Sequence, residues 1–168
     1  MVQYQTCHYT YKYGHVQGRD IGLQDTYSVD TLINITCNAI DDLSGIASKE
    51  CPSVEGPAYT FELGAHKITA PATDKAGNTA KVDIEFTITV DFDSLSRLTQ
   101  SFVSKDGVAH SLVAKLQSAK EGAVKGNKQT VDGKLKAYEN ELSAQIGKTI
   151  TEEQANIFIS LSDMLYLK

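Results

Sequence analysis

The sequence predicts a protein of mixed β and α structure, in which an antiparallel β-sandwich is followed by a small bundle of three to four helices. Before Phe92, apolar and polar residues alternate, which is typical of strands with one buried and one wet face. After Phe92, apolar residues recur every three or four positions, which is typical of amphipathic helices. The predicted division is a leader or edge strand over 1–19, the sandwich over 20–91 and the bundle over 92–168.

The alternation in the first part falls into short segments separated by turn-forming residues. The clearest segments are 33–39, 59–63 and 82–90, and smaller side chains continue the pattern over 68–72. Between them lie clusters of Asp, Gly, Asn, Ser and Pro, which favour turns. Short strands joined by turns at this spacing predict two packed sheets.

Four apolar stripes in the second part predict helices that pack on one another. A cap at Asp93 or Ser94 is expected to begin the first helix, and Thr151 with Gln154 forms a capping box that begins the last one. The stripes are Leu95, Leu98 and Phe102; Val108, Leu112, Leu116 and Ala119; Val131, Leu135, Tyr138, Leu142 and Ile146; and Ile157, Phe158, Leu161, Met164 and Leu165. The glycines near the predicted helix ends are Gly107, Gly126 and Gly147.

The composition argues against nucleic acid as the partner and against a membrane span. The 168 residues include 16 Lys and Arg and 21 Asp and Glu, for a net charge of -5. Binding a polyanion requires clustered basic residues, whereas the basic residues here alternate with acids. The sequence has no run of about 18 apolar residues that would span a bilayer. No secretory signal follows Met1, so the signal of a secreted parent protein is expected upstream.

Three cysteines, Cys7, Cys37 and Cys51, favour an oxidising compartment. Cys37 and Cys51 lie 14 positions apart across a turn-rich stretch, which predicts a local disulfide that stabilises the fold by about 3 kcal/mol. A zinc site would need closer Cys and His spacing, such as Cys-x-x-Cys. We therefore expect an extracellular protein, secreted or on the cell surface, in which Cys7 is either free or paired between chains.

Two stretches resemble modules that often follow catalytic domains in secreted bacterial glycosidases, lyases, phosphoesterases and proteases. Residues 37–46, Cys51, residues 64–68 and the hairpin Ala-Thr-Asp-Lys-Ala-Gly-Asn over 72–78 resemble bacterial Ig-like modules of the HYR-like kind. Residues 94–166 resemble the FIMAH domain, and the matching residues include Leu95, Leu98, Phe102, Leu112, Leu116, Ala119, Gly126, Leu135, Tyr138, Gly147, Thr151 and Gln154. The resemblance covers about residues 27–166 and implies an accessory role without catalytic residues. The start of the chain, with Cys7, matches neither module.

The residues themselves also argue against catalysis. A nucleophilic triad needs a Ser or Cys beside an oriented His, but His8, His15, His66 and His110 lie in different predicted elements. His110 is expected to be a partly buried packing residue. The acids lie mainly on turns and outward strand faces rather than in a pair across a cleft. The chain is therefore expected not to be an enzyme.

A calcium site is one interpretation of two acidic turns. If both turns lie at the same end of the sandwich, they gather hard oxygen ligands of the kind calcium prefers. The alternative is that these side chains bond their own backbone and shape the turns. The residues concerned are Asp41, Asp42, Asp74 and Asn78.

A group of tyrosines near the start is a candidate surface for stacking on sugar rings. Tyr9, Tyr11 and Tyr13 alternate along the chain, and their flat amphipathic rings suit a pyranose face as well as a protein contact. The alternative is an edge strand or a leader. No cofactor other than calcium is indicated.

Together these observations favour a non-catalytic accessory or attachment module of a secreted bacterial enzyme, binding polysaccharide or cell-wall polymer. One alternative is a purely structural spacer that positions or stabilises a catalytic domain. Another is a protein–protein interaction module. The expected partners are the upstream catalytic domain of the parent protein and a polysaccharide, and an exposed aromatic patch would favour binding over a spacer.

Overall fold

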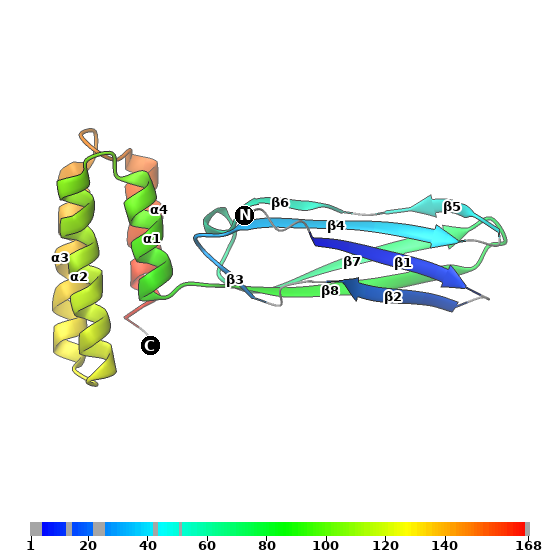
Figure 1. Cartoon of the computed structure of the whole chain (residues 1–168), viewed down its shortest axis with the longest axis horizontal. Helices are drawn as coiled ribbons and strands as arrows, with labels where there is room; N and C mark the ends of the chain where they lie inside the picture. The colour runs from blue at the N-terminus through cyan, green and yellow to red at the C-terminus, as the bar shows by residue number, and fades with distance from the viewer. Residues whose placement is uncertain (1–4, 13–14, 22–25, 42–43, 51, 167–168) are drawn as a thin grey trace. The chain divides into compact units, whose positions relative to one another are not determined.

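The computed structural model describes residues 5–12, 15–21, 26–41, 44–50 and 52–166. The predicted site residues Tyr13, Asp42 and Cys51 lie outside these ranges. The chain divides into two compact units, one of Met1–Tyr27 with Thr31–Thr89 and one of Ser28–Asp30 with Val90–Lys168. Strands make up the first unit and four α-helices the second, which confirms the predicted mixed β and α fold (Figure 1).

The strands form two four-stranded sheets. One sheet has the order β2 (His15–Ile21), β1 (Gln5–Lys12), β4 (Leu32–Asp41) and β6 (Val54–Pro57). The other has the order β3 (Thr26–Ser28), β8 (Thr79–Thr89), β7 (Gly64–Asp74) and β5 (Ile46–Lys49). The long strands β7 and β8 pair antiparallel in an unbroken register.

The predicted antiparallel arrangement is wrong for one strand pair, because β1 and β4 run parallel. β1 turns back into β2 as an antiparallel hairpin, with Lys12 opposite His15. The next strand, β3, belongs to the other sheet. β4 therefore returns to the first sheet in the same direction as β1. The hairpin places β1 inside this mixed sheet and β2 at its edge.

Side chains from both sheets build the core of the first unit. The predicted alternation on β4 and β8 is confirmed by residues that are at most 8% exposed, namely Ile33, Ile35, Ala39, Ile84, Phe86 and Ile88. Phe86 also makes an edge-to-face contact with Tyr27, with ring centroids 5.8 Å apart. Such aromatic pairs add specific geometry to the burial of apolar area.

The strand predicted over 59–63 is wrong. Ala58–Thr60 form one turn of 3₁₀ helix, η1, after Pro57. The Thr60 hydroxyl donates to the Pro57 carbonyl at 2.7 Å, and the Phe61 N–H donates to the Ala58 carbonyl at 3.2 Å. These local bonds outweigh an alternation of only five residues, which is too short to specify a strand.

The second unit consists of α1 (Phe92–Phe102), α2 (Asp106–Val124), α3 (Lys128–Gln145) and α4 (Glu152–Asp163). Both α1 and α3 contact α2 and α4, so the four helices close into a bundle (Figure 1). Its largest fully buried side chains are Leu95, Thr99, Leu112, Leu116, Leu135, Tyr138, Leu142 and Phe158. Within the described residues, no helix has the length and apolar character required to cross a membrane.

Capping interactions define two of the helix starts. The predicted box at Thr151 is confirmed, because Thr151 Oγ1 accepts from the Gln154 N–H at 3.2 Å and Gln154 Oε1 accepts from the Thr151 N–H at 3.0 Å. The cap of α1 is Asp91 rather than Asp93 or Ser94. Asp91 Oδ1 accepts from the Ser94 N–H at 2.7 Å, and Ser94 Oγ accepts from the Asp91 N–H at 2.9 Å. This second box starts the helix two or three residues earlier than the sequence predicts.

Candidate functional site

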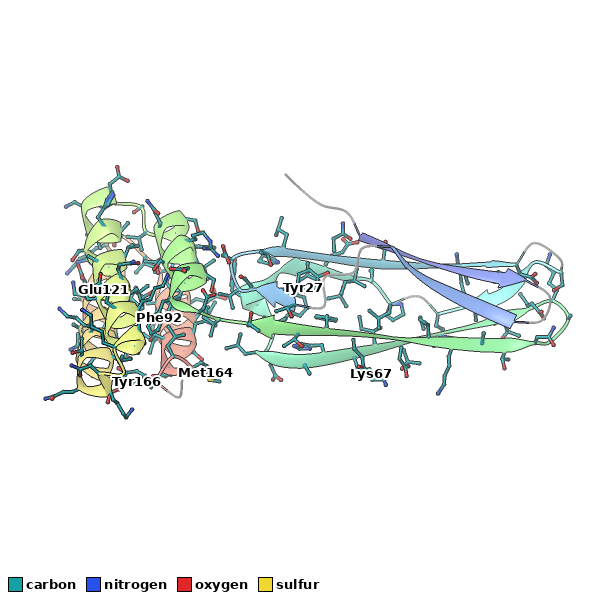
Figure 2. The ribbon with its side chains drawn as sticks, turned by 60° about the horizontal axis from the view of Figure 1, so that its bottom comes forward. Tyr27, Lys67, Phe92, Glu121, Met164 and Tyr166 are labelled. Carbon is teal, nitrogen blue, oxygen red and sulfur yellow. The ribbon has the colours of Figure 1, made fainter. Side chains whose placement is uncertain are left out.

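A cavity of about 450 Å³ lies at one end of the helical bundle. Four helix ends surround it: α1 begins at Phe92, α2 ends at Val124, α3 begins at Lys128 and α4 ends at Asp163. This is the lower end of the helices in Figure 1, and Figure 2 labels Phe92 and Tyr166 there. The volume is within the range of about 300–1,000 Å³ that is usual for ligand pockets.

The cavity lining combines apolar surface with one ion pair. The lining residues are Phe92, Ala123, Gly126, Lys128, Val131, Asp132, Leu165 and Tyr166. Lys128 Nζ lies 3.3 Å from Asp132 Oδ1, one helical turn away, and the two side chains are 75% and 42% exposed. A pair as exposed as this contributes at most about 1 kcal/mol. Separating its ammonium from its carboxylate would therefore cost little free energy.

A buried carboxylate fixes the position of Tyr166 in the cavity wall. The Tyr166 hydroxyl donates to Glu139 Oε1 at 2.9 Å, while Glu139 Oε2 accepts from Lys136 Nζ at 3.1 Å. Glu139 is only 7% exposed. Burial, and then the hydrogen bond to Glu139, raise the pKa of Tyr166 above its ordinary value of 10.0. The hydroxyl therefore stays protonated at neutral pH and keeps the ring oriented.

The two turns predicted to bind calcium contact each other. The Lys75 N–H donates to the Gly45 carbonyl at 2.9 Å, which joins the turn after β4 to the turn after β7. The two turns therefore lie at the same end of the first unit, as the calcium interpretation requires. Asp41 and Asp74 lie beside this junction and are 8% and 3% exposed. Buried carboxylates of this kind need hydrogen-bond donors or a cation.

Both carboxylates receive hydrogen bonds from their own turns. Asp74 accepts from the backbone N–H of Asn78 at 2.8 Å and from its side-chain amide at 2.7 Å, and Asp41 accepts from the Ser44 hydroxyl and N–H. The bonds from Asn78 lower the pKa of Asp74, against the opposing effect of desolvation. These contacts support the turn-shaping interpretation. Among the described residues, no three His, Cys, Asp or Glu are grouped to hold a metal ion, and calcium stays a prediction because Asp42 lies outside them.

Two of the three predicted sugar-stacking residues, Tyr9 and Tyr11, belong to β1. Tyr9 stands opposite Gly18 of β2 and Ala39 of β4, and Tyr11 follows two positions later on the same strand. Tyr13 lies outside the described residues. Since β1 is paired along both edges, this part of the chain is built into the sheet. Stacking on sugar rings by these residues stays a prediction.

Two histidines donate hydrogen bonds to main-chain oxygens of their own segments. His66 Nε2 donates to the Glu62 carbonyl at 2.7 Å, and its ring stacks on Phe86 with centroids 5.0 Å apart. His110 Nδ1 donates to the Asp106 carbonyl at 2.8 Å. His110 is exposed, so the predicted partial burial is wrong: its position on α2 faces away from the stripe that packs on α1 and α3. The His110 ring is thus held by its own helix, and the His66 ring by its own segment and by Phe86 of the neighbouring strand.

No family model, curated protein or solved structure matches the chain. The resemblance to HYR-like and FIMAH modules therefore rests on the sequence residues alone. Among the features of the described side chains, the cavity at the bundle end is the one that suggests binding. It offers a concave, mainly apolar surface with polar groups at its edge.

Sequence reasoning missed this cavity. The prediction of Val131 and Leu165 as core residues is confirmed, because they are 7% and 2% exposed. It gives no sign that both also line a cavity, and it assigns no role to Tyr166, which lines the cavity with them. One signal was present: an aromatic residue directly follows the apolar stripe of the last helix, and Phe92 begins the first. Periodicity describes each helix separately, so it does not show that these two aromatic residues line the same cavity at one end of the bundle.

Proposed function

We propose that the chain is a non-catalytic accessory module of a secreted bacterial enzyme, composed of an Ig-like β-sandwich and a FIMAH-like helical bundle. In this proposal the cavity at the bundle end attaches the parent enzyme to a polysaccharide or cell-wall polymer. The observation that carries the proposal is the combination, in one cavity, of the rings of Phe92 and Tyr166 with the exposed pair Lys128 and Asp132.

The chemistry of a sugar ring suits such a lining. A pyranose has C–H groups on its faces, which pack on aromatic rings, and hydroxyl groups around its edge, which donate and accept hydrogen bonds. Phe92 and Tyr166 are partly exposed and supply the aromatic surface, whereas Val131 and Leu165 are 7% and 2% exposed and add little to it. At the rim, the Lys128 ammonium is a donor and the Asp132 carboxylate is an acceptor, so together they match a pair of neighbouring hydroxyls.

The charges favour a neutral glycan over an acidic one. Asp132 places a carboxylate at the rim beside Lys128, and the chain as a whole carries a net charge of -5. A polyanion would be repelled by both, whereas neutral hydroxyl groups use the donor and the acceptor equally. Uncharged polysaccharides are therefore the first ligands to test.

A purely structural role is the second candidate, and one observation favours it. The junction of the turns after β4 and β7 buries Asp41 and Asp74 and joins the turns by the bond from Lys75 to Gly45. Such a closed end suits a spacer that holds a catalytic domain at a distance. A protein-interaction role would instead use exposed apolar side chains, such as Val124 at 80% and Met164 at 41% exposure.

A pull-down with the full chain over insoluble cellulose, chitin, xylan and peptidoglycan tests the proposal. The wild type should be retained on at least one of them. Lys128→Ala and Asp132→Ala should each reduce the affinity about five-fold, the equivalent of one hydrogen bond of about 1 kcal/mol. Lys134→Ala, at an exposed position on the same helix, is the matched control and should bind like the wild type. Failure of the wild type to bind any of the four, or equal binding by all variants, would contradict the proposal.

A further inference from the structure

The strand β4 lies between β1 and β6 in the first sheet, and it carries Cys37. On one side, β1 runs parallel to it with Cys7 as the partner of Cys37 in the register. This register extends without a shift over seven residue pairs, from Gln5 with Ile35 to Tyr11 with Asp41. Two cysteines that are 30 positions apart in the sequence thus occupy opposite positions on adjacent strands.

This placement suits a covalent bond. Neighbouring strands in a sheet lie about 4.7–4.9 Å apart, and disulfides join residues whose Cα atoms are about 4.4–6.8 Å apart. A slip by one residue would instead place Cys7 opposite Thr36 or Asn38 and turn the strand over. On its other edge, β1 pairs with β2, where Cys7 stands opposite Asp20. We propose that Cys7 and Cys37 are joined by a disulfide and that Cys51 is the remaining thiol.

The bond forms by exchange with a low-molecular-weight disulfide such as oxidised glutathione. The thiolate of one cysteine attacks this disulfide, forms a mixed disulfide and releases one small thiol. The thiolate of the other cysteine then displaces the second small thiol and closes the protein disulfide. Two protein thiols are oxidised, one small disulfide is reduced to two thiols, and the two protons lost by the cysteines are taken up by the departing thiolates.

The bond would fasten the N-terminal hairpin to the rest of the sheet. β2 is the edge strand and pairs with β1, so in this sheet the hairpin is joined to β4 through the β1 ladder alone. A disulfide between β1 and β4 keeps that ladder closed by removing the open states of the loop between Cys7 and Cys37. The proposed Cys7–Cys37 disulfide and the Cys37–Cys51 disulfide predicted from the sequence exclude each other, because Cys37 can form only one disulfide.

Trypsin separates the two pairings cleanly. It cuts after Lys12, Arg19, Lys49 and Lys67, which places the three cysteines in the peptides 1–12, 20–49 and 50–67. The oxidised monomer, isolated by gel filtration, is treated with iodoacetamide and digested without reductant. We expect a linked pair of peptides 1–12 and 20–49, with Cys51 alkylated. A link between 20–49 and 50–67, a link between 1–12 and 50–67, or three alkylated cysteines would overturn the proposal.

Two variants support the mapping with an independent readout. Cys51→Ser keeps both proposed partners and should still give the linked peptides 1–12 and 20–49. Reductant should speed hydrogen exchange of the β1 and β2 amides about tenfold or more in the wild type and in Cys51→Ser. Cys7→Ser should show the faster exchange with and without reductant. If reductant changes the β1 amides of Cys7→Ser as much as those of the wild type, the bond is not the proposed one.

Discussion

The hydroxyl of Tyr138 on α3 lies 2.7 Å from Oγ1 of Thr99 on α1, and both residues are fully buried. Thr99 Oγ1 donates to the Leu95 carbonyl at 2.8 Å, so the Tyr138 hydroxyl is the donor of the bond between the helices. Burial raises the pKa of Tyr138 above its ordinary value, which keeps this donor protonated. With these two bonds, the hydroxyl groups of Thr99 and Tyr138 both have hydrogen-bond partners.

This relationship predicts an asymmetric response to mutation. Thr99→Val leaves the Tyr138 hydroxyl buried without an acceptor and should lower the free energy of unfolding by about 1–3 kcal/mol. Tyr138→Phe leaves Thr99 bonded to Leu95 and should cost about 1 kcal/mol. Because the double variant removes both groups, its cost should be less than the sum of the single costs. Urea unfolding followed by helical circular dichroism measures all three, and additive costs would show that the two hydroxyls are not coupled.

Two helical glycines provide a matched pair for testing how closely α2 and α3 pack. A Cβ added at Gly122 would lie 3.0 Å from Cγ2 of Thr130 and 3.3 Å from the backbone N of Val131, whereas a Cβ at Gly133 would meet nothing within 4 Å. Gly122→Ala should therefore destabilise the bundle by about 1–3 kcal/mol. Gly133→Ala should stabilise it by about 0.5–1 kcal/mol. Thermal melts of the two variants give the signs, and equal shifts would show that α2 and α3 pack less closely at Gly122.

The lowered pKa of Asp74 predicts a pH dependence in the first unit. The bonds from Asn78 hold this pKa below its ordinary 3.8, so the unfolded state binds the proton more readily than the folded state. The stabilising effect is therefore present above the ordinary pKa and is lost as the pH falls through the lower folded value. Hydrogen exchange of the β7 and β8 amides should be faster in Asp74→Asn than in the wild type at pH 6, with the difference shrinking below pH 4. Exposed Glu62→Gln serves as the control, and a difference that is constant with pH would contradict the role given to Asp74.

Local signals were the part of the fold that the sequence could predict. The box at Thr151 and Gln154 depends on residues three apart. Gly126 and Gly147 adopt positive φ angles of 66° and 73° directly after α2 and α3, as expected for helix ends. Gly107 lies inside the first turn of α2 instead. The alternation on β8 was informative because one face of this long strand, with Ile84, Phe86 and Ile88, is buried.

Features that depend on distant parts of the chain could not be predicted in this way. Between β2 and β4 the chain passes through the other sheet at β3, and β4 then pairs parallel with β1. No local sequence pattern indicates to which sheet a strand belongs. The opposition of Cys7 and Cys37 follows from the same register. The cavity likewise arises where four helix ends meet, so its lining residues Phe92 and Tyr166 lie at opposite ends of the helical sequence.

Nuclear magnetic resonance of the ¹⁵N-labelled chain, titrated with a soluble oligomer of the polysaccharide that retains it, tests most directly whether the cavity is the attachment site. The amide shifts that move should be those of the cavity lining, above all Gly126, Lys128, Val131, Asp132 and Tyr166. Lys128→Ala should weaken the response at all of these positions together. Shift changes confined to the strands of the first unit, or none at saturating oligosaccharide, would contradict binding at the bundle end.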